Sequence, residues 1–280
     1  MRVAIRQHLI DTIPAIEERC FEPHAAEADT PKPYLVIRQG TESEDTAWTG
    51  FRRIIEVWPY VSRTSFTEVD ALADQIINQL DKQLLATETG EIFTCQYLGT
   101  TGSDDVDHEW DLITRGLRFA VLALQPANIQ ETVVEYNWLT ALSEWTRQEL
   151  GSDWDIYTQM WPLGYRRPCV LWRLSQIGVR SKTRGAFEVE KKVVGHVLGS
   201  TPNEEVAGVL RLVEGIGRDV KLPLNAERRI YMTASDVKGD YQADGLTRGQ
   251  ISLTLSRMTA RPSEEAPLMQ RVSNEGGWKV

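Results

Sequence analysis

The 280-residue sequence has few cysteines and no long apolar run, and each shortage excludes a class of protein. Its three cysteines, Cys20, Cys95 and Cys169, are odd in number and far apart, which argues against a disulfide framework. We interpret each as a small buried hydrophobe in a reducing compartment. The longest apolar run, Phe119 to Leu124, is far too short to span a bilayer. Met1 to Asp11 lacks the apolar region of a signal peptide, so we expect a cytoplasmic protein with no membrane partner.

Motifs for catalysis and metal binding are also scarce. Cys20 and His24 are four residues apart, but no second pair completes a zinc site. The chain has no HExxH motif, Walker loop or GxSxG elbow. Asp105, Asp107, Glu109 and Asp111 alternate as calcium ligands do, yet Trp110 and Gly116 stand where an EF-hand loop that starts at Asp105 needs Gly and Glu. We therefore expect no enzyme activity, no cofactor and no metal.

The net charge of −9 is unevenly distributed. Residues 1–130 hold 21 acidic and 11 basic side chains, whereas the remaining residues hold 19 and 20. An acidic surface repels nucleic-acid phosphates, so we expect no specific nucleic-acid partner. The candidates for a basic patch are Tyr165 to Arg167 and Arg180 to Arg184, which we interpret as solvated loops.

The strongest pattern is internal repetition. Apolar periodicity predicts helix, strand, strand, helix, strand, strand in the first half of the chain and the same order in the second. Four landmarks recur in order at offsets of 133 to 136 residues. They are a proline-led strand (Pro33 to Arg38, Pro168 to Arg173), a glycine-led strand (Gly50-Phe51, Gly185 to Phe187), a helix capping box (Ser65 to Glu68, Thr201 to Glu204) and a strand start (Ile113 to Gly116, Leu246 to Gly249).

This order predicts an α+β fold of two tandem domains. Each domain would be a four-stranded antiparallel sheet with both helices packed on one face, in the order α-β-β-α-β-β. We place the first domain at residues 1–125 and the second at residues 126–258. Residues 259–280 have no counterpart in the first half, and their composition suggests an extended C-terminal arm.

The first half, with its "TGFRRIIEVW" strand, "SFTEVDALADQIINQL" helix and closing "DDVDHEWD" segment, resembles the phage tail-terminator or tail-to-head joining family. The second half resembles it chiefly through the first, and the duplication departs from the single domain that is typical of the family.

The resemblance implies an assembly role in a bacteriophage or phage-like particle. Family members form a ring, usually a hexamer, that caps the head-proximal end of the tail tube and stops its polymerisation. The implied partners are further copies of the chain, the tail tube protein, neck or head-completion proteins and, in a contractile tail, the sheath protein. The implied location is the virion tail or neck, assembled in the host bacterial cytoplasm.

Five side chains are candidates for subunit interfaces. Trp48, Trp110 and Trp278 fall in predicted loops or the arm, where a tryptophan is either an interface anchor or ordinary core. Arg115 and Arg248 fall at equivalent strand starts. Each forms either an ion pair between subunits or a local pair with the acidic segment before it.

Three other interpretations remain open from the sequence. The chain is another neck or tail-completion protein, or a soluble module that binds one partner peptide on a sheet edge. An enzyme is the interpretation that the sequence favours least, because no nucleophile and base occur in a recognisable pattern.

Overall fold

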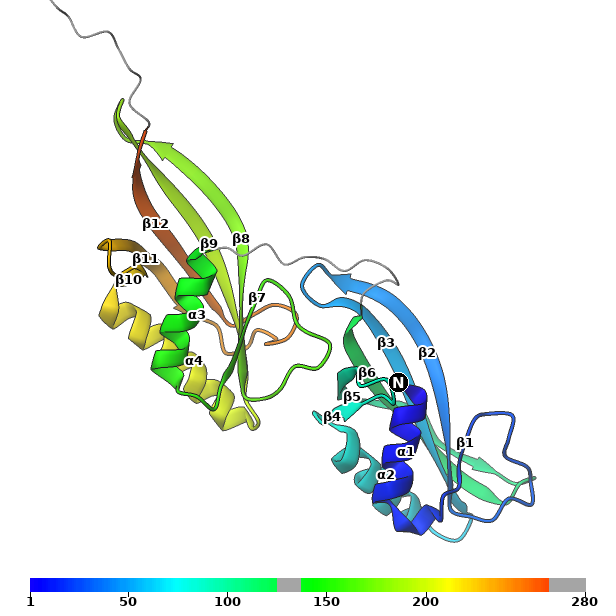
Figure 1. The fold of residues 1–280 in the computed structure, drawn as a ribbon. Helices are drawn as coiled ribbons and strands as arrows, with labels where there is room; N and C mark the ends of the chain where they lie inside the picture. The colour runs from blue at the N-terminus through cyan, green and yellow to red at the C-terminus, as the bar shows by residue number, and fades with distance from the viewer. Residues whose placement is uncertain (125–136, 262–280) are drawn as a thin grey trace, which may run out of the picture.

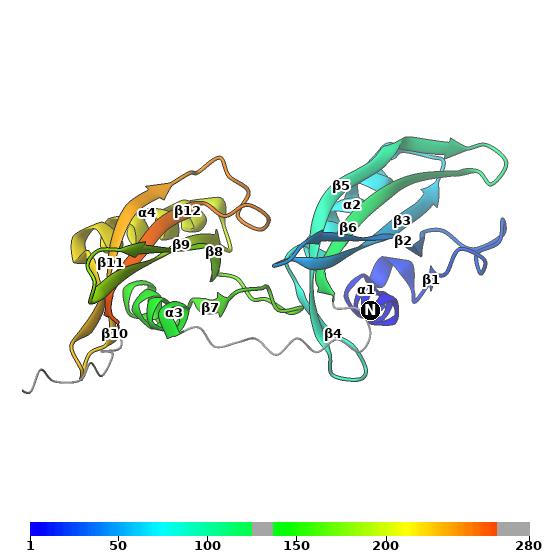
Figure 2. The ribbon, with the colours of Figure 1, turned by 90° about the horizontal axis from the view of Figure 1, so that it is seen from above.

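The structure is a computed structural model that describes residues 1–124 and 137–261. It contains two α+β domains, one before and one after the gap at 125–136 (Figure 1). Each domain is a curled six-stranded mixed sheet with its helices packed on one face, and the turned view shows the two sheets as separate units (Figure 2).

The two domains have the same order of elements. The first runs α1 (Arg2–Thr12), η1 (Pro14–Ile16), β1 (Cys20–Phe21), β2 (Tyr34–Thr46), β3 (Gly50–Ser62), α2 (Phe66–Leu80), β4 (Leu84–Ala86), β5 (Ile92–Asp107) and β6 (Leu112–Leu124). The second runs α3 (Asn137–Leu150), β7 (Asp155–Thr158), β8 (Cys169–Ser181), β9 (Ala186–Leu198), α4 (Pro202–Asp219), β10 (Lys221–Asn225), β11 (Ile230–Gly239) and β12 (Ile251–Ala260).

The strands are also arranged alike. The first sheet has the order β1-β2-β3-β6-β5-β4, and the second has the matching order β7-β8-β9-β12-β11-β10. The prediction that both halves share one backbone plan is therefore confirmed at the level of topology.

The prediction of four antiparallel strands per sheet is wrong, because each sheet has six. The missed strands β1, β4, β7 and β10 are two to five residues long, too short to show a period-two pattern. Strands β1 and β7 run parallel to their neighbours β2 and β8, so both sheets are mixed.

Local signals set the helix ends. Helix α1 ends at Thr12, and Pro14, which lacks an amide proton, opens a short 3-10 turn two residues later. The hydroxyl of Ser65 accepts from the amide of Thr67 at the start of α2. The hydroxyl of Thr201 accepts from the amide of Glu204, and Pro202 opens α4, as a capping box with an N1 proline predicts.

Each domain has its own apolar core between helices and sheet. In the first, Leu9 of α1 and Ile76 of α2 pack with Phe119 of β6, all fully buried. In the second, Leu142 and Leu212 pack with Trp172 of β8. Gly195 lets that indole lie close to β9, because a Cβ at this position would come within 2.4 Å of the ring.

The strands are longer than predicted, and this moves two predicted segments. Asp104 to Asp107 belong to β5, so only residues 108–111 form the turn that was predicted to span Asp104 to Asp111. Strand β12 extends to Ala260, so the first two residues of the predicted arm are strand; residues 262–280 lie outside the described residues. Among the described residues, no helix has the length and hydropathy needed to cross a membrane.

Candidate functional site

The most developed polar and aromatic cluster is the joint between the two domains. Trp48, in the β2–β3 turn of the first domain, lies against the outer face of the second sheet, the face opposite the helices. Its indole N–H donates to the carbonyl of Thr247 at 3.1 Å, and the guanidinium of Arg173 lies 3.6 Å from its ring centroid. Its backbone carbonyl accepts from the amide of Trp161 at 2.9 Å. The β2–β3 turn of the first domain thus packs on the outer face of the second sheet.

His196 of β9 positions the Arg173 side chain that contacts Trp48. Its Nδ1 donates to the carbonyl of Gly245 at 2.8 Å, and its Nε2 accepts from Nε of Arg173 at 2.9 Å, which fixes the neutral tautomer. The pKa of His196 is lowered to about 4, mainly by burial and also by the charge of Arg173, and these outweigh the raising effect of the bond to Gly245. Burial also lowers the pKa of Arg173. The neutral imidazole of His196 therefore accepts from the Arg173 guanidinium and positions it against the Trp48 ring.

A second group of contacts comes from the 159–168 segment that precedes β8. Thr94 of β5 donates its amide to the carbonyl of Leu163 at 3.1 Å and its hydroxyl to the carbonyl of Tyr165 at 2.7 Å. A Cβ at Gly164 would come within 2.7 Å of the Ile92 side chain, so glycine permits this close approach. An apolar cluster fills the joint, formed by Leu122 of the first domain and by Trp161, Tyr165, Cys169, Leu171, Leu198 and Leu246 of the second.

The second domain contacts Trp48 on the outer face of its sheet. At the equivalent position the first domain has an open pocket. The pocket encloses about 200 Å³ and is lined by Pro23, Ala26, Tyr34, Val36, Arg38, Tyr60, Asp107, Trp110 and Leu112. The two sites correspond in detail, because Arg38 of β2 donates to the Tyr60 hydroxyl of β3 at 3.4 Å, as Arg173 of β8 donates to His196 of β9. Tyr60 and His196 each stand three residues after a core valine, Val57 or Val193.

The aromatic rings at this pocket contact one another and Arg38. Tyr34 and Tyr60 stack with centroids 4.8 Å apart, and Arg38 lies 4.9 Å from the ring centroid of Trp58. Burial raises the pKa of Tyr34 to about 12, with smaller contributions from Tyr60 and Asp107. Both phenols are therefore neutral at physiological pH, and the pocket is aromatic with a carboxylate at its edge.

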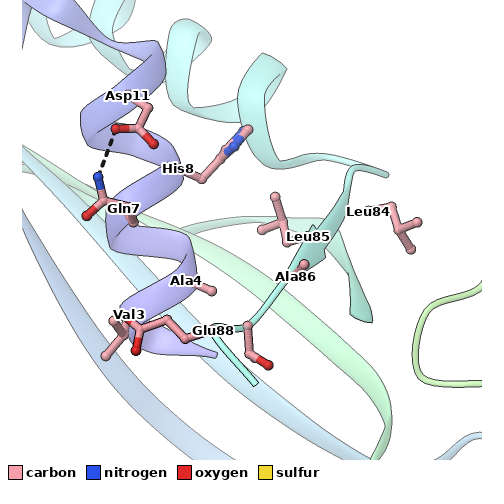
Figure 3. Close-up of a pocket in the computed structure, with 10 residues that line it drawn as sticks. Val3, Ala4, Gln7, His8, Asp11, Leu84, Leu85, Ala86 and Glu88 are labelled. Atoms are coloured by element: carbon pink, nitrogen blue, oxygen red, sulfur yellow. Dashed lines mark hydrogen bonds between the residues drawn. The ribbon is translucent and has the colours of Figure 1, made fainter. Parts of the chain in front are cut away.

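A separate groove lies between α1 and the edge strand β4 (Figure 3). It encloses about 330 Å³ and is lined by Val3, Ala4, Gln7, His8, Asp11, Leu84, Leu85, Ala86, Thr87 and Glu88. The polar groups here have local partners: Gln7 donates to Asp11 at 2.8 Å, and Nε2 of His8 lies 3.0 Å from the carbonyl of Gln79. The lining combines apolar side chains such as Val3 and Leu84 with these locally bonded polar groups.

The predicted interface tryptophans have different surroundings. Trp48 contacts the second domain of its own chain, and Trp110 lines the open pocket. Trp278 lies outside the described residues.

The two predicted arginines are not equivalent. Arg115 lies inside β6 and forms a bidentate pair with Asp104 at 2.6 and 2.8 Å, together with a contact to Asp70 of α2 at 2.8 Å. Arg248 is exposed and precedes β12. Strand pairing shows that Arg115 and Arg248 are not counterparts. Val57 faces Leu117 and Val193 faces Leu253, so the counterpart of Arg115 is Ile251.

Several residues of the joint carry no motif that sequence reasoning recognises, notably Trp161, Arg173 and His196. The signal that was present is the apolar and aromatic content of residues 159–168, which is unusual for a connection between a helix and a strand. Among the residues that the structure describes, no group of three or more His, Cys, Asp or Glu side chains is placed to hold a metal ion.

Comparison with known proteins shows likeness to chains of solved structures. No protein-family model matches the chain, and no curated protein matches it. A chain from a solved structure titled "Virion of native gene transfer agent (GTA) particle" is similar with a TM-score of 0.36 and 13% sequence identity. The likeness covers 44% of this chain and 92% of that chain. A likeness of this size does not establish a function.

Proposed function

We propose that the chain is a structural, non-catalytic subunit of a phage or phage-like tail, a tail terminator that assembles into a ring on the head-proximal end of the tail tube. The observation that supports this best is the joint between the domains. Two domains of one plan meet through different surfaces, the tip of the first against the outer sheet face of the second. Contacts of this heterologous kind generate rings when the rotation closes.

The ionisable groups of the described residues fit a structural role. Burial raises the pKa of Cys20 and of Cys95 to about 12, so at neutral pH both are thiols rather than nucleophilic thiolates. His196 is neutral, and both of its ring nitrogens are engaged in hydrogen bonds inside the joint. The burial of these three groups is what a structural role leads us to expect.

The partners in this proposal are further copies of the chain, the tube protein, neck or head-completion proteins and, in a contractile tail, the sheath protein. The test is the mass of the purified chain by light scattering, alone and with the tube protein of the same particle. A ring, or a complex at tube ends, is the expected result. A monomeric mass under both conditions would contradict it. Location in a reconstruction of the particle separates a terminator from another neck protein.

A second candidate function is supported by the groove beside β4. An edge strand next to a groove of about 330 Å³ is the geometry that accepts an added peptide strand. This candidate predicts one-to-one complexes and no ring. The same light-scattering experiment therefore separates the two functions.

A further inference from the structure

The joint inside the chain uses the β2–β3 turn of the first domain and the outer sheet face of the second. The equivalent face of the first domain and the equivalent turn of the second have no partner within the described residues. The first domain keeps its open pocket, and the second domain keeps its β8–β9 turn, residues 182–185. Figure 1 shows that turn and the 22–33 segment beside the pocket at opposite extremes of the molecule. The pocket corresponds to the site that receives Trp48, and the turn corresponds to the one that carries Trp48.

Arg184 stands in the second domain where Trp48 stands in the first. Each lies in the turn between the second and third strands of its half, three residues before a phenylalanine, Phe187 or Phe51. Arg184 is exposed, and among the described residues its side chain has no recorded hydrogen bond or ion pair. Met258, the counterpart of the joint residue Leu122, is 52% exposed. This end of the second domain thus presents a cation and an apolar side chain to solvent.

The charges at the two ends are complementary. Residues 180–184 contain Arg180, Lys182 and Arg184. Arg180 pairs with Glu190 and Lys182 with Glu188, which leaves Arg184 as the cation of this turn that has no acidic partner among the described residues. Residues 22–29 and 104–111, which contribute to the pocket, contain eight carboxylates, and two of these, Asp104 and Asp111, pair with arginines. The cations beside the pocket are Arg38, in its lining, and Lys32, which donates to the carbonyl of Trp110. Opposite charges of this kind attract at distances comparable to the Debye length, about 8–10 Å at physiological salt. The internal joint, by contrast, has an uncharged indole, Trp48, at the tip of the turn, and the cation there, Arg173, belongs to the receiving sheet.

The pocket itself suits a guanidinium group. Tyr34, Tyr60 and Trp110 contribute aromatic rings to its lining, and Asp107 contributes a carboxylate. Aromatic faces attract cations, and arginine stacks on them more readily than lysine because its guanidinium is planar. Arg38, the cation already in the lining, lies over Trp58 and donates to Tyr60.

We propose that copies of this chain join head to tail by repeating the internal joint, with Arg184 of one copy entering the Tyr34–Tyr60–Asp107 pocket of the next. This inference rests on the proposed ring-forming function and names the contact that would build the ring. Domains would then alternate first, second, first, second around the assembly, linked by an apolar joint within each chain and a charged joint between chains.

Cysteine crosslinking tests the contact directly in the full-length chain. The amide of Trp161 donates to the carbonyl of Trp48 in the internal joint, and at the proposed contact Ala26 lines the pocket while Arg184 stands at the turn position of Trp48. The double variant Ala26→Cys with Arg184→Cys should form disulfide-linked dimers and longer ladders under mild oxidation. Each single variant should form none, and so should Ala26→Cys with Lys192→Cys, which moves the second thiol to the middle of the outer face. The native cysteines are buried and should give no background.

Charge reversal gives an independent measurement by sedimentation. We expect Arg184→Glu to weaken self-association by about tenfold or more, because it places a carboxylate opposite the carboxylate of Asp107. Rings that form equally well with Arg184→Glu, together with no specific crosslink, would overturn the head-to-tail contact while leaving the proposed function intact. A wild-type chain that stays monomeric, alone and with tube protein, would overturn both.

Discussion

Replacing Trp48 with alanine should uncouple the two domains. The substitution removes a half-buried indole from the joint, which we expect to cost about 2 kcal/mol from lost burial and packing. It also removes the hydrogen bond to Thr247 and the stacking on Arg173, each worth about 1 kcal/mol. The expected loss is about 3–4 kcal/mol of coupling free energy between the domains, because nearly all of these contacts cross from one domain to the other.

Scanning calorimetry measures that coupling. The wild-type chain should unfold with a strongly overlapped transition, whereas Trp48→Ala should resolve into two transitions with the less stable domain shifted to lower temperature. Trp110→Ala is the matched control, because it removes the same side chain from the open pocket, where no second domain is bound. A Trp48→Ala profile that coincides with that of the wild type would refute the assignment of Trp48 as the anchor of the joint.

Three further predictions concern single residues. Because the pKa of His196 is lowered to about 4, the folded protein binds fewer protons than the unfolded chain between pH 4 and 6.5. Lowering the pH from 7.5 to 5 should therefore reduce the free energy of unfolding by about 2 kcal/mol more in wild type than in His196→Asn, as measured by urea denaturation. The control variant His24→Gln should behave as wild type. Gly195→Ala should destabilise the second domain by about 2–3 kcal/mol in the same assay, because its methyl group meets the Trp172 ring, while Gly178→Ala has open space and should change little. Arg115→Met should cost about 1 kcal/mol and let the lowered pKa of Asp104 return toward its ordinary value in an NMR titration, and an unchanged Asp104 pKa would contradict the bidentate pair.

Much of the fold could be predicted from local chemistry. The capping residues Ser65 and Thr201, the helix stop at Pro14 and the period-two strands all act over a few residues, so their signals are visible in the sequence. Repetition of these signals predicted the repeated topology. The edge strands β1, β4, β7 and β10 were missed because pairing with a neighbour, rather than side-chain pattern, makes them strands.

The joint could not be predicted, because its contacts link residues far apart in the chain. Trp48 meets Thr247 and Arg173 only after both sheets have formed. The sequence indicated Trp48 as a candidate interface anchor, but not that the partner surface belongs to the same chain. Arg248 was misaligned for a related reason: the length of the β11–β12 connection sets its position, and only strand register reveals that length.

Electron microscopy of the purified chain mixed with the tube protein of its own particle tests the central claim most directly. We predict closed rings on tube ends, in which the two kinds of domain alternate around the axis. Particles that contain single chains, two-fold symmetric dimers or one-to-one complexes would contradict the claim.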